Sequence, residues 1–201
     1  MTITNSEDVI DSRDIIDRIE ELQEKRQPWA AGWNMPGYMP DSEPAAFSGW
    51  ESARSYLRDE IERAAEETDN KEEAKALQET AERVDALNDG DEFGETTGTY
   101  HWWLTNLGAD AGLDRDESEE LAALEKLTEE ASDYAADWDY GETLIRDSYF
   151  KEYAQQLADD IGAINPDARW PNNCIDWERA ARELQSDYTA VDFDGVTYWV
   201  R

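Results

Sequence analysis

The sequence predicts an α+β fold that is predominantly helical and ends in a carboxyl-terminal β-hairpin. Several segments repeat apolar residues at the three- and four-residue spacing of an amphipathic helix. Residues 188–200 hold two β-rich runs on either side of Asp194-Gly195, a pair favoured in two-residue hairpin turns. Nine Trp, nine Tyr and four Phe can build a core, unlike the aromatic-poor composition of acidic disordered chains.

The first helix is predicted over 11–26, with Asp11 as a candidate cap and Pro28 after its end. Its predicted buried face consists of Ile15, Ile16, Ile19 and Leu22. The following stretch, 27–47, contains four prolines and shows no clear period. We expect an ordered loop held by aromatic side chains, with a binding loop as the alternative.

Two further helices are predicted between 48 and 90. Ser48 and Glu51 form a capping-box pattern before the first of them. The break at 68–70 separates it from the second, which 88–90, Asn-Asp-Gly, should end. Because the connection is short, an antiparallel helical hairpin is expected.

The remaining elements alternate between aromatic and acidic segments. Residues 96–104, TTGTYHWWL, favour a strand or a strand pair. An acidic helix should begin at Asp116 and continue to Trp138, and two more helices are expected over 147–161 and 176–185. The buried stripe predicted for the acidic helix consists of Leu121, Leu124, Leu127, Ala131, Ala135 and Trp138.

The chain is strongly acidic, with 50 Asp+Glu against 18 Lys+Arg, a net charge of -32 and a pI near 4.1. This charge argues against direct binding to nucleic acid or to anionic membranes, because both are polyanions. Cations and proteins with basic surfaces are the plausible partners. We find neither a signal-peptide pattern nor an apolar run long enough for a membrane span, so a cytoplasmic protein is expected.

The acidity is uneven along the chain. Residues 89–145 carry 17 acids and 2 bases, whereas the predicted hairpin interleaves its charges. The i,i+4 pairs expected in the hairpin are Asp59 with Arg63, Arg63 with Glu67, and Lys75 with Glu79. We therefore divide the chain into three regions: 1–90, helical; 91–145, acidic and central; and 146–201, carboxyl-terminal.

A ridge of like charges lies in the central region. On a continuous helix Glu125, Glu129, Asp133 and Asp137 would stand at successive i+4 positions, where each like-charged pair costs about 0.2–0.5 kcal/mol. If 114–139 were all helical, its 11 acids would span roughly 39 Å, about one per 3.5 Å, close to the phosphate spacing of about 3.4 Å along one DNA strand. The predicted partner-binding residues are Glu119, Glu125, Glu129, Glu130, Asp133 and Asp137.

The sequence gives little support for a catalytic site or a metal site. His101 is the sole histidine, and Cys174, the sole cysteine, has no neighbouring basic residue that would clearly activate it; we expect both to be structural. Residues 89–95 begin like a calcium loop, but aromatic residues occupy two ligand positions, which leaves only weak divalent-cation binding open. We expect no catalytic residues, no cofactor and no dedicated metal site.

The carboxyl-terminal region, 146–201, resembles the end of ArdA-type antirestriction proteins. The resemblance lies in YFKEYAQQLADDIGAI, in the helix that follows NNC, and in the final aromatic hairpin. The matching positions of that helix are Ile175, Asp176, Ala181, Arg182 and Leu184. The resemblance implies a protein of phage or mobile-element origin that mimics DNA, blocks type I restriction-modification enzymes and forms homodimers.

Together these observations predict a noncatalytic DNA mimic whose carboxylates occupy the basic DNA-binding groove of a host defence complex. A type I restriction enzyme is the first expectation, and a CRISPR effector is the alternative target. A halophilic acidic shell is a different interpretation, supported by 5 Lys against 13 Arg. An acidic binder of basic proteins and an enzyme that uses carboxylates also remain open.

Overall fold

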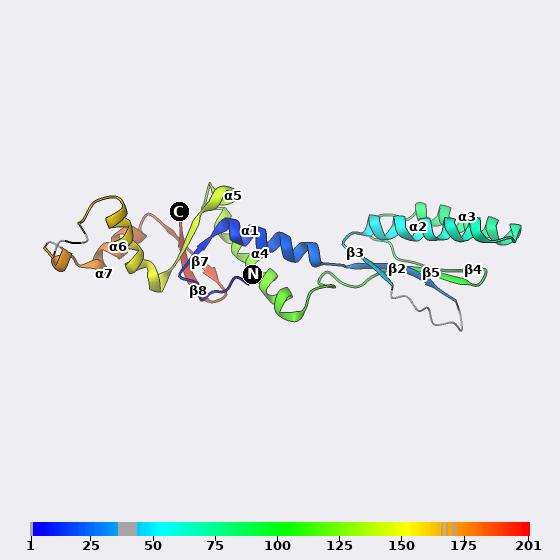
Figure 1. Ribbon diagram of the computed structural model, residues 1–201, viewed down its shortest axis with the longest axis horizontal. Coiled ribbons are helices and arrows are strands. Elements are labelled where there is room, and N and C mark those ends of the chain that lie inside the picture. Colours follow the sequence, from blue (N-terminus) through cyan, green and yellow to red (C-terminus); the bar gives the residue numbers. More distant parts are fainter. Residues whose placement is uncertain (1, 36–43, 166, 168, 171) are drawn as a thin grey trace. The chain divides into compact units, whose positions relative to one another are not determined.

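The computed structural model describes residues 2–35, 44–165, 167, 169–170 and 172–201. The chain divides into two compact units (Figure 1). Unit 1 contains Met1–Leu22 and Arg115–Arg201, and unit 2 contains Gln23–Asp114. Each unit has its own four-stranded sheet and its own core.

Unit 1 is built around a sheet with strand order β1-β6-β8-β7, in which all neighbours are antiparallel. The strands are β1 (Val9–Asp11), β6 (Thr143–Arg146), β7 (Thr189–Phe193) and β8 (Val196–Val200). The helices are α1 (Ser12–Lys25), α4 (Arg115–Ser132), α5 (Trp138–Gly141), α6 (Phe150–Asp160) and α7 (Trp177–Gln185), with 3-10 turns at Asp147–Tyr149 and Asn172–Cys174.

The sheet of unit 1 is covered by helices on both faces. Consecutive side chains of a strand point to opposite faces, so Leu144 and Tyr198 join one core while Ile145 and Trp199 join the other. The first core includes Ile15 of α1 together with Leu124, Leu127 and Ala131 of α4. The second includes Phe150 and Ala154 of α6 and Ala181 of α7. Unit 1 is therefore a three-layer helix–sheet–helix structure.

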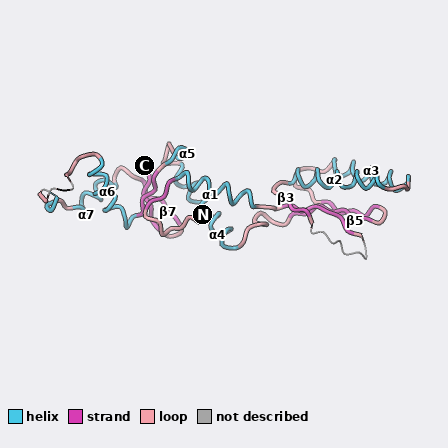
Figure 2. Tube along the Cα trace, viewed as in Figure 1, coloured by secondary structure: helices cyan, strands magenta, loops and turns pink. Residues whose placement is uncertain are grey.

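Unit 2 has the strand order β3-β2-β5-β4, again antiparallel throughout. Its elements are β2 (Trp29–Asn34), β3 (Ala45–Phe47), α2 (Trp50–Glu67), α3 (Lys71–Asp85), β4 (Phe93–Thr97) and β5 (Tyr100–Asn106). Figure 2 shows the two helices together on one side of the sheet. Leu57 and Ile61 of α2 and Leu77 of α3 pack there with Trp102, all fully buried.

The predicted fold class is confirmed, since the chain is 50% helical and 20% strand and ends in the β7–β8 hairpin. Asp194 and Gly195 form the hairpin turn with φ of 48° and 79°, as a type I′ turn requires. Asp176 caps α7 by accepting a hydrogen bond from Arg179 N at 3.1 Å. The expected strand pair near 96–104 is also present, as β4 and β5.

The prediction of an irregular loop over 27–47 is wrong where the structure describes this stretch. Trp29–Asn34 forms β2 and lies between β3 and β5, because Trp29, Ala31 and Trp33 alternate onto the side covered by helices. Ala45–Phe47 forms the edge strand β3. The middle of the predicted loop, 36–43, lies outside the described residues.

The close approach of Trp103 explains why a glycine, Gly32, occupies the middle of strand β2. A Cβ atom at this position would lie 3.1 Å from Cζ2 of Trp103, which is paired with Gly32 across the sheet. Trp103 is also paired with Gly94 on its other side. The indole therefore lies over backbone that carries no side chain of its own.

Helix capping and ion pairing differ from expectation in the hairpin of unit 2. Gly49 holds the amino-terminal cap position of α2 without a side-chain hydrogen bond, so the capping box predicted from Ser48 and Glu51 is wrong. Lys75 pairs with Glu79 at 3.5 Å as expected. Arg63, however, pairs with Glu60 three residues before it; neither of its two expected i,i+4 pairs is formed within the described part of the chain.

The compact units cut across the three regions drawn from the sequence. The helical region 1–90 is shared by both units, because α1 packs mainly in unit 1 while α2 and α3 belong to unit 2. The acidic region 91–145 is divided at Arg115, and 146–201 lies entirely in unit 1. Strand β1, in the amino-terminal segment of unit 1, pairs with β6, in its carboxyl-terminal segment, although all of unit 2 lies between them in the sequence.

Candidate functional site

The six predicted partner-binding residues all lie in unit 1 and define what we call the acidic face. Four of them are on α4: Glu119 and Glu129 are exposed, while Glu125 and Glu130 are half-buried. The exposed Asp133 lies in the turn that follows, and the exposed Asp137 immediately precedes α5. The six residues therefore lie on α4, on the turn after it and next to the start of α5, and not on one helix.

The expectation that the acidic helix continues to Trp138 is wrong, because α4 ends at Ser132. Tyr134 N and Ala135 N both bond to the carbonyl of Ala131, at 3.1 Å, which closes the helix in a tight turn. No proline or glycine between Ser132 and Trp138 signals this end. The turn places Ala135 and Trp138 in the first core of unit 1, where they are 2% and 4% exposed.

Trp138 is fixed by backbone hydrogen bonds to the start of α1. Ser12 Oγ donates to the carbonyl of Trp138 at 2.6 Å and accepts from Glu142 N at 2.7 Å. Ser12 N also donates to the carbonyl of Glu142 at 2.9 Å. These contacts between residues about 130 apart in the chain hold the end of the acidic face in place, and they explain why Ser12 is fully buried.

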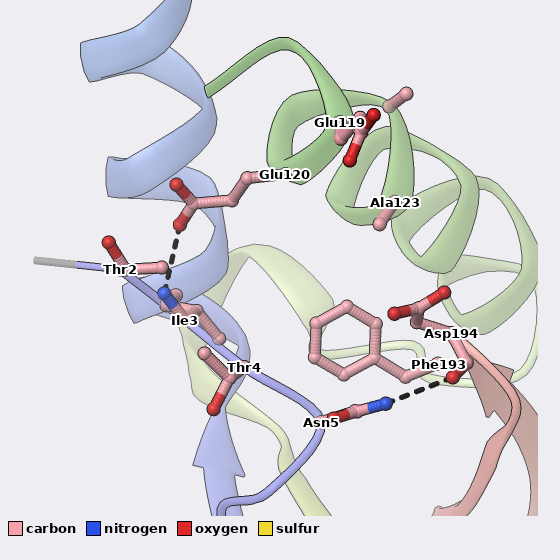
Figure 3. A pocket seen from close by; sticks show the side chains of 10 residues that line it. Thr2, Ile3, Thr4, Asn5, Glu119, Glu120, Ala123, Phe193 and Asp194 are labelled. Carbon is pink, nitrogen blue, oxygen red and sulfur yellow. Dashed lines mark hydrogen bonds between the residues drawn. The ribbon is translucent and has the colours of Figure 1, made fainter. Parts of the chain in front are cut away.

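The other end of α4 is held by a buried ion pair. Arg18 of α1 bonds to Glu120 through Nε at 3.1 Å and through Nη2 at 2.7 Å, and both side chains are only 8% exposed. Glu120 also accepts a hydrogen bond from Ile3 N at 2.9 Å (Figure 3). The hydrogen bonds that Arg18 donates to the Glu120 carboxylate raise the pKa of Arg18. A paired guanidinium and carboxylate with satisfied hydrogen bonds is the form in which buried charges are tolerated.

The apolar side of α4 is fully buried, so the acidic face is a fixed surface. Every member of the predicted stripe is buried, including the two that lie beyond the helix: Leu121, Leu124, Leu127, Ala131, Ala135 and Trp138. Burial of a leucine stabilises a fold by about 1.5–3 kcal/mol. Three leucines therefore supply more free energy than the like-charge repulsion on the opposite side of the helix removes.

Four carboxylates of the acidic face lack a neutralising partner. Glu129, Glu130, Asp133 and Asp137 make no ion pair within the part of the chain that the structure describes. Among the described residues, Glu119 pairs with the highly exposed Arg115 of the same helix, at 2.7 Å. An exposed pair of this kind contributes at most about 1 kcal/mol. The surface is therefore anionic and held rigid at the same time.

The shorter helix changes the comparison with DNA only slightly. The 18 residues of α4 span about 27 Å at 1.5 Å per residue and carry seven acids, about one per 3.9 Å. The phosphates of one DNA strand recur about every 3.4 Å. One of the seven, Glu120, is neutralised by Arg18, and further exposed acids follow in the turn and in α5.

Sequence reasoning missed two contributors near the acidic face. Helix α1 packs over the same face of the sheet as α4 and exposes carboxylates of its own, among them Asp14, Asp17 and Glu20. Two tyrosines lie among the acids after α4, Tyr134 at 59% and Tyr140 at 80% exposure. Their position off the apolar stripe, beside Asp133 and Asp139, was the available signal.

The remaining candidate residues, His101 and Cys174, lie in different units. His101 Nδ1 hydrogen-bonds Thr96 Oγ1 at 3.0 Å on strands of unit 2, and Cys174 is exposed. Within the described ranges no group of three or more His, Cys, Asp or Glu side chains is arranged to hold a metal ion. None of the described helices has both the length and the apolar character needed to cross a bilayer.

Comparisons with protein-family models, with curated proteins and with solved structures find no match for this chain. The resemblance of 146–201 to ArdA-type proteins therefore stays a prediction from the sequence.

Proposed function

We propose that this protein is a noncatalytic DNA mimic that inhibits a DNA-binding complex of a host defence system. The observation that carries the proposal is a rigid surface whose carboxylates at Glu129, Glu130, Asp133 and Asp137 lack internal ion pairs. Such a surface is complementary to a groove in which Lys and Arg neutralise DNA phosphates. A type I restriction-modification enzyme is the proposed target, on the resemblance of 146–201, and a CRISPR effector is the alternative.

The proposal explains why like charges are concentrated in one stretch of the chain. Their mutual repulsion is opposed by buried leucines and by the Arg18–Glu120 pair when the protein is free. When the protein is bound, cationic side chains of the target would relieve the repulsion, and long-range attraction would speed the encounter. Exposed tyrosines beside the acids add a surface on which arginine can stack. We further propose that the protein acts in the cytoplasm, where its targets cleave DNA, and that it acts as a homodimer.

A competition assay tests the proposal directly. Purified type I restriction enzyme is given a fluorescent DNA duplex that contains its recognition site, and the protein is titrated in at low and at high salt. Displacement of the duplex at low salt, weakened by high salt and overcome by a higher concentration of the labelled duplex, is the expected result. The same titration with a CRISPR effector decides between the two targets.

Absence of displacement from both complexes would contradict the proposal. A pull-down from bacterial lysate at low and high salt, with mass spectrometry of the eluate, provides the wider search. The halophilic interpretation predicts a different outcome, namely that the protein captures nothing and folds only in concentrated salt. Circular dichroism at low ionic strength separates these cases, because a DNA mimic must be folded under the conditions in which it binds.

A further inference from the structure

A groove opens in unit 1 next to the acidic face, with a volume of about 580 Å³. Three parts of the chain form it: the amino-terminal segment 2–5, the α4 residues around Glu119 and Ala123, and Phe193-Asp194 at the β7–β8 turn (Figure 3). Its volume lies within the roughly 300–1,000 Å³ that ligand pockets commonly enclose. These are segments that only the folded chain brings together.

The groove combines an apolar floor with anionic walls. Ile3, Ala123 and Phe193 contribute apolar surface, and all three belong to or pack against the first core of unit 1. The carboxylates of Glu119 and Asp194 stand on two sides. Such a combination disfavours an anion, and a purely apolar occupant would remove carboxylates from water without replacing their hydrogen bonds.

The carboxylates that line the groove differ in whether an ion pair within the chain already neutralises them. Glu120 is committed to Arg18 and to Ile3 N, so it forms a wall without free charge. Glu119 holds only the exposed Arg115 of its own helix. The Asp194 carboxylate has no ion pair in the described part of the chain, and its position is fixed because the Asp194 carbonyl accepts from Asn5 Nδ2 at 2.9 Å.

We propose that this groove receives one long cationic side chain, arginine or lysine, from the partner that binds the acidic face; its assignment to that partner rests on the proposed function. The methylene stem would pack along Ala123 and Phe193 while the charged head group reaches Asp194 and Glu119. Lysine and arginine bury their stems in this way and keep the charge at a polar rim. The groove thereby adds an anchoring pocket to a surface that otherwise offers carboxylates and exposed tyrosines.

Nuclear magnetic resonance of the full chain tests the groove without any knowledge of the partner. The probes are N-acetyl-arginine amide and N-acetyl-lysine amide, with N-acetyl-norleucine amide as an uncharged probe that keeps an aliphatic stem. We expect saturable amide shifts at residues 2–5, at Ala123 and at Asp194 with one or both cationic probes, and none with norleucine. Equal shifts with norleucine, or shifts confined to other surfaces, would overturn the inference.

Two groove variants and one control variant test whether the probes bind in the groove. Ala123→Arg puts a cation of the chain itself on the floor and should abolish the saturable shifts. Ala163→Arg, at an exposed position after α6, makes the same change of charge and should leave the shifts intact. Asp194→Asn, which keeps a residue tolerant of positive φ, should weaken binding about fivefold, the size of one exposed charge pair, and remains informative if Ala123→Arg fails to fold.

The inference and the proposed function can fail separately. If the probes bind in the groove but no DNA-binding complex is inhibited, the groove stands and the DNA mimic does not. If inhibition is salt-sensitive but Ala123→Arg inhibits as well as Ala163→Arg, the groove is not an anchor and the DNA mimic stands. Undiminished probe binding to both Ala123→Arg and Asp194→Asn would remove the groove assignment altogether.

Discussion

The α2–α3 hairpin of unit 2 and the stretch 115–142 of unit 1 use the same number of acids in opposite ways. The two hairpin helices and 115–142 each contain 11 acidic residues, but the helices also contain 6 bases, whereas 115–142 contains 2. In the hairpin, Arg58 lies near Asp59, Glu62 and Asp85, and Lys75 pairs with Glu79. Negative charge in the hairpin is neutralised locally, while on the acidic face much of it is left for something outside the chain.

The comparison shows that composition alone does not make a binding surface. Both stretches would increase the net negative charge of the chain, its solubility and its rate of association with basic proteins. Only the acidic face combines unpaired carboxylates with anchors at both ends, at Arg18–Glu120 and at Ser12–Trp138. A surface that is fixed before binding loses less conformational entropy on association than a mobile one.

The largest expected effect comes from Arg18→Met, which breaks the amino-terminal anchor of the acidic face. It leaves the Glu120 carboxylate buried without its partner, and removing one member of a buried pair costs about 3–5 kcal/mol. Arg58→Met in α2 breaks only partly exposed pairs and should cost less than about 1 kcal/mol. Hydrogen exchange in urea, measured separately on peptides of unit 1 and unit 2, gives the two free energies.

A double variant controls for the loss of the arginine itself. Glu120→Gln removes the buried charge but keeps an oxygen that can accept from Ile3 N. Arg18→Met combined with Glu120→Gln should therefore recover the greater part of the lost stability. If Arg18→Met and Arg58→Met destabilise their units equally, the acidic face is not anchored by this pair.

The second effect is on binding and tests whether the two acidic surfaces differ in function. Replacing Glu129, Asp133 and Asp137 together by Lys should weaken binding to the target about 100-fold or more at low salt, because three attractive charges become repulsive. Replacing Glu66, Glu67 and Asp69 of unit 2 by Lys changes the net charge equally and should leave most of the affinity.

Fluorescence competition against labelled duplex gives both affinities, and circular dichroism checks that both triple variants are folded. Equal loss in the two would mean that net charge, not the acidic face, determines binding. Retained inhibition by the first variant alone would remove the assignment of Glu129, Asp133 and Asp137.

Glu92 provides a third test, because it is a carboxylate of unit 2 with a structural role. It accepts from Thr105 Oγ1 at 2.5 Å and from Asn106 N at 2.8 Å, and these bonds lower its pKa below the ordinary 4.5. A lowered pKa stabilises the fold above the ordinary value, and this stabilisation is lost as the pH falls through the folded value. Glu92→Gln should therefore destabilise unit 2 at pH 7, and the difference from the native chain should shrink below about pH 4.5.

Urea unfolding of unit 2 at a series of pH values between 7 and 3 checks this prediction. A difference between Glu92→Gln and the native chain that stays constant across the series would contradict a role for the ionised carboxylate.

Local patterns predicted the parts of the structure that local physics determines. The turn at Asp194-Gly195 requires positive φ and the sequence supplies suitable residues, and the stripe from Leu121 to Trp138 follows from spacing alone. The predicted acidic residues could likewise be placed on the surface, because they lie off that stripe. The spacing of the apolar residues did not predict the end of α4 at Ser132. That end depends on the docking of Trp138 against Ser12.

Contacts between distant segments account for the other misses. Strand β2 reads WAAGWN, whose Ala and Gly residues disfavour strands, and it exists because β3 and β5 pair with it on both sides. Arg18 looks like an ordinary exposed base on an amphipathic helix, and its burial depends on a glutamate 102 residues away. The groove beside α4 needs three separate segments, so no single stretch of sequence could indicate it.

The smallest expected effect is on the free energy of unfolding, and its sign should differ between the acidic face and the α2–α3 hairpin. Glu129→Gln on α4 removes a like-charge i,i+4 contact with Glu125 and should stabilise unit 1 by about 0.2–0.5 kcal/mol at low salt. Glu79→Gln on α3 removes the 3.5 Å ion pair with Lys75 and should destabilise unit 2 by a similar amount. Both differences should fade in 1 M salt, where the Debye length is about 3 Å. A destabilising Glu129→Gln would mean that this carboxylate already has a partner within the chain, and the acidic face would then have less charge to offer a target.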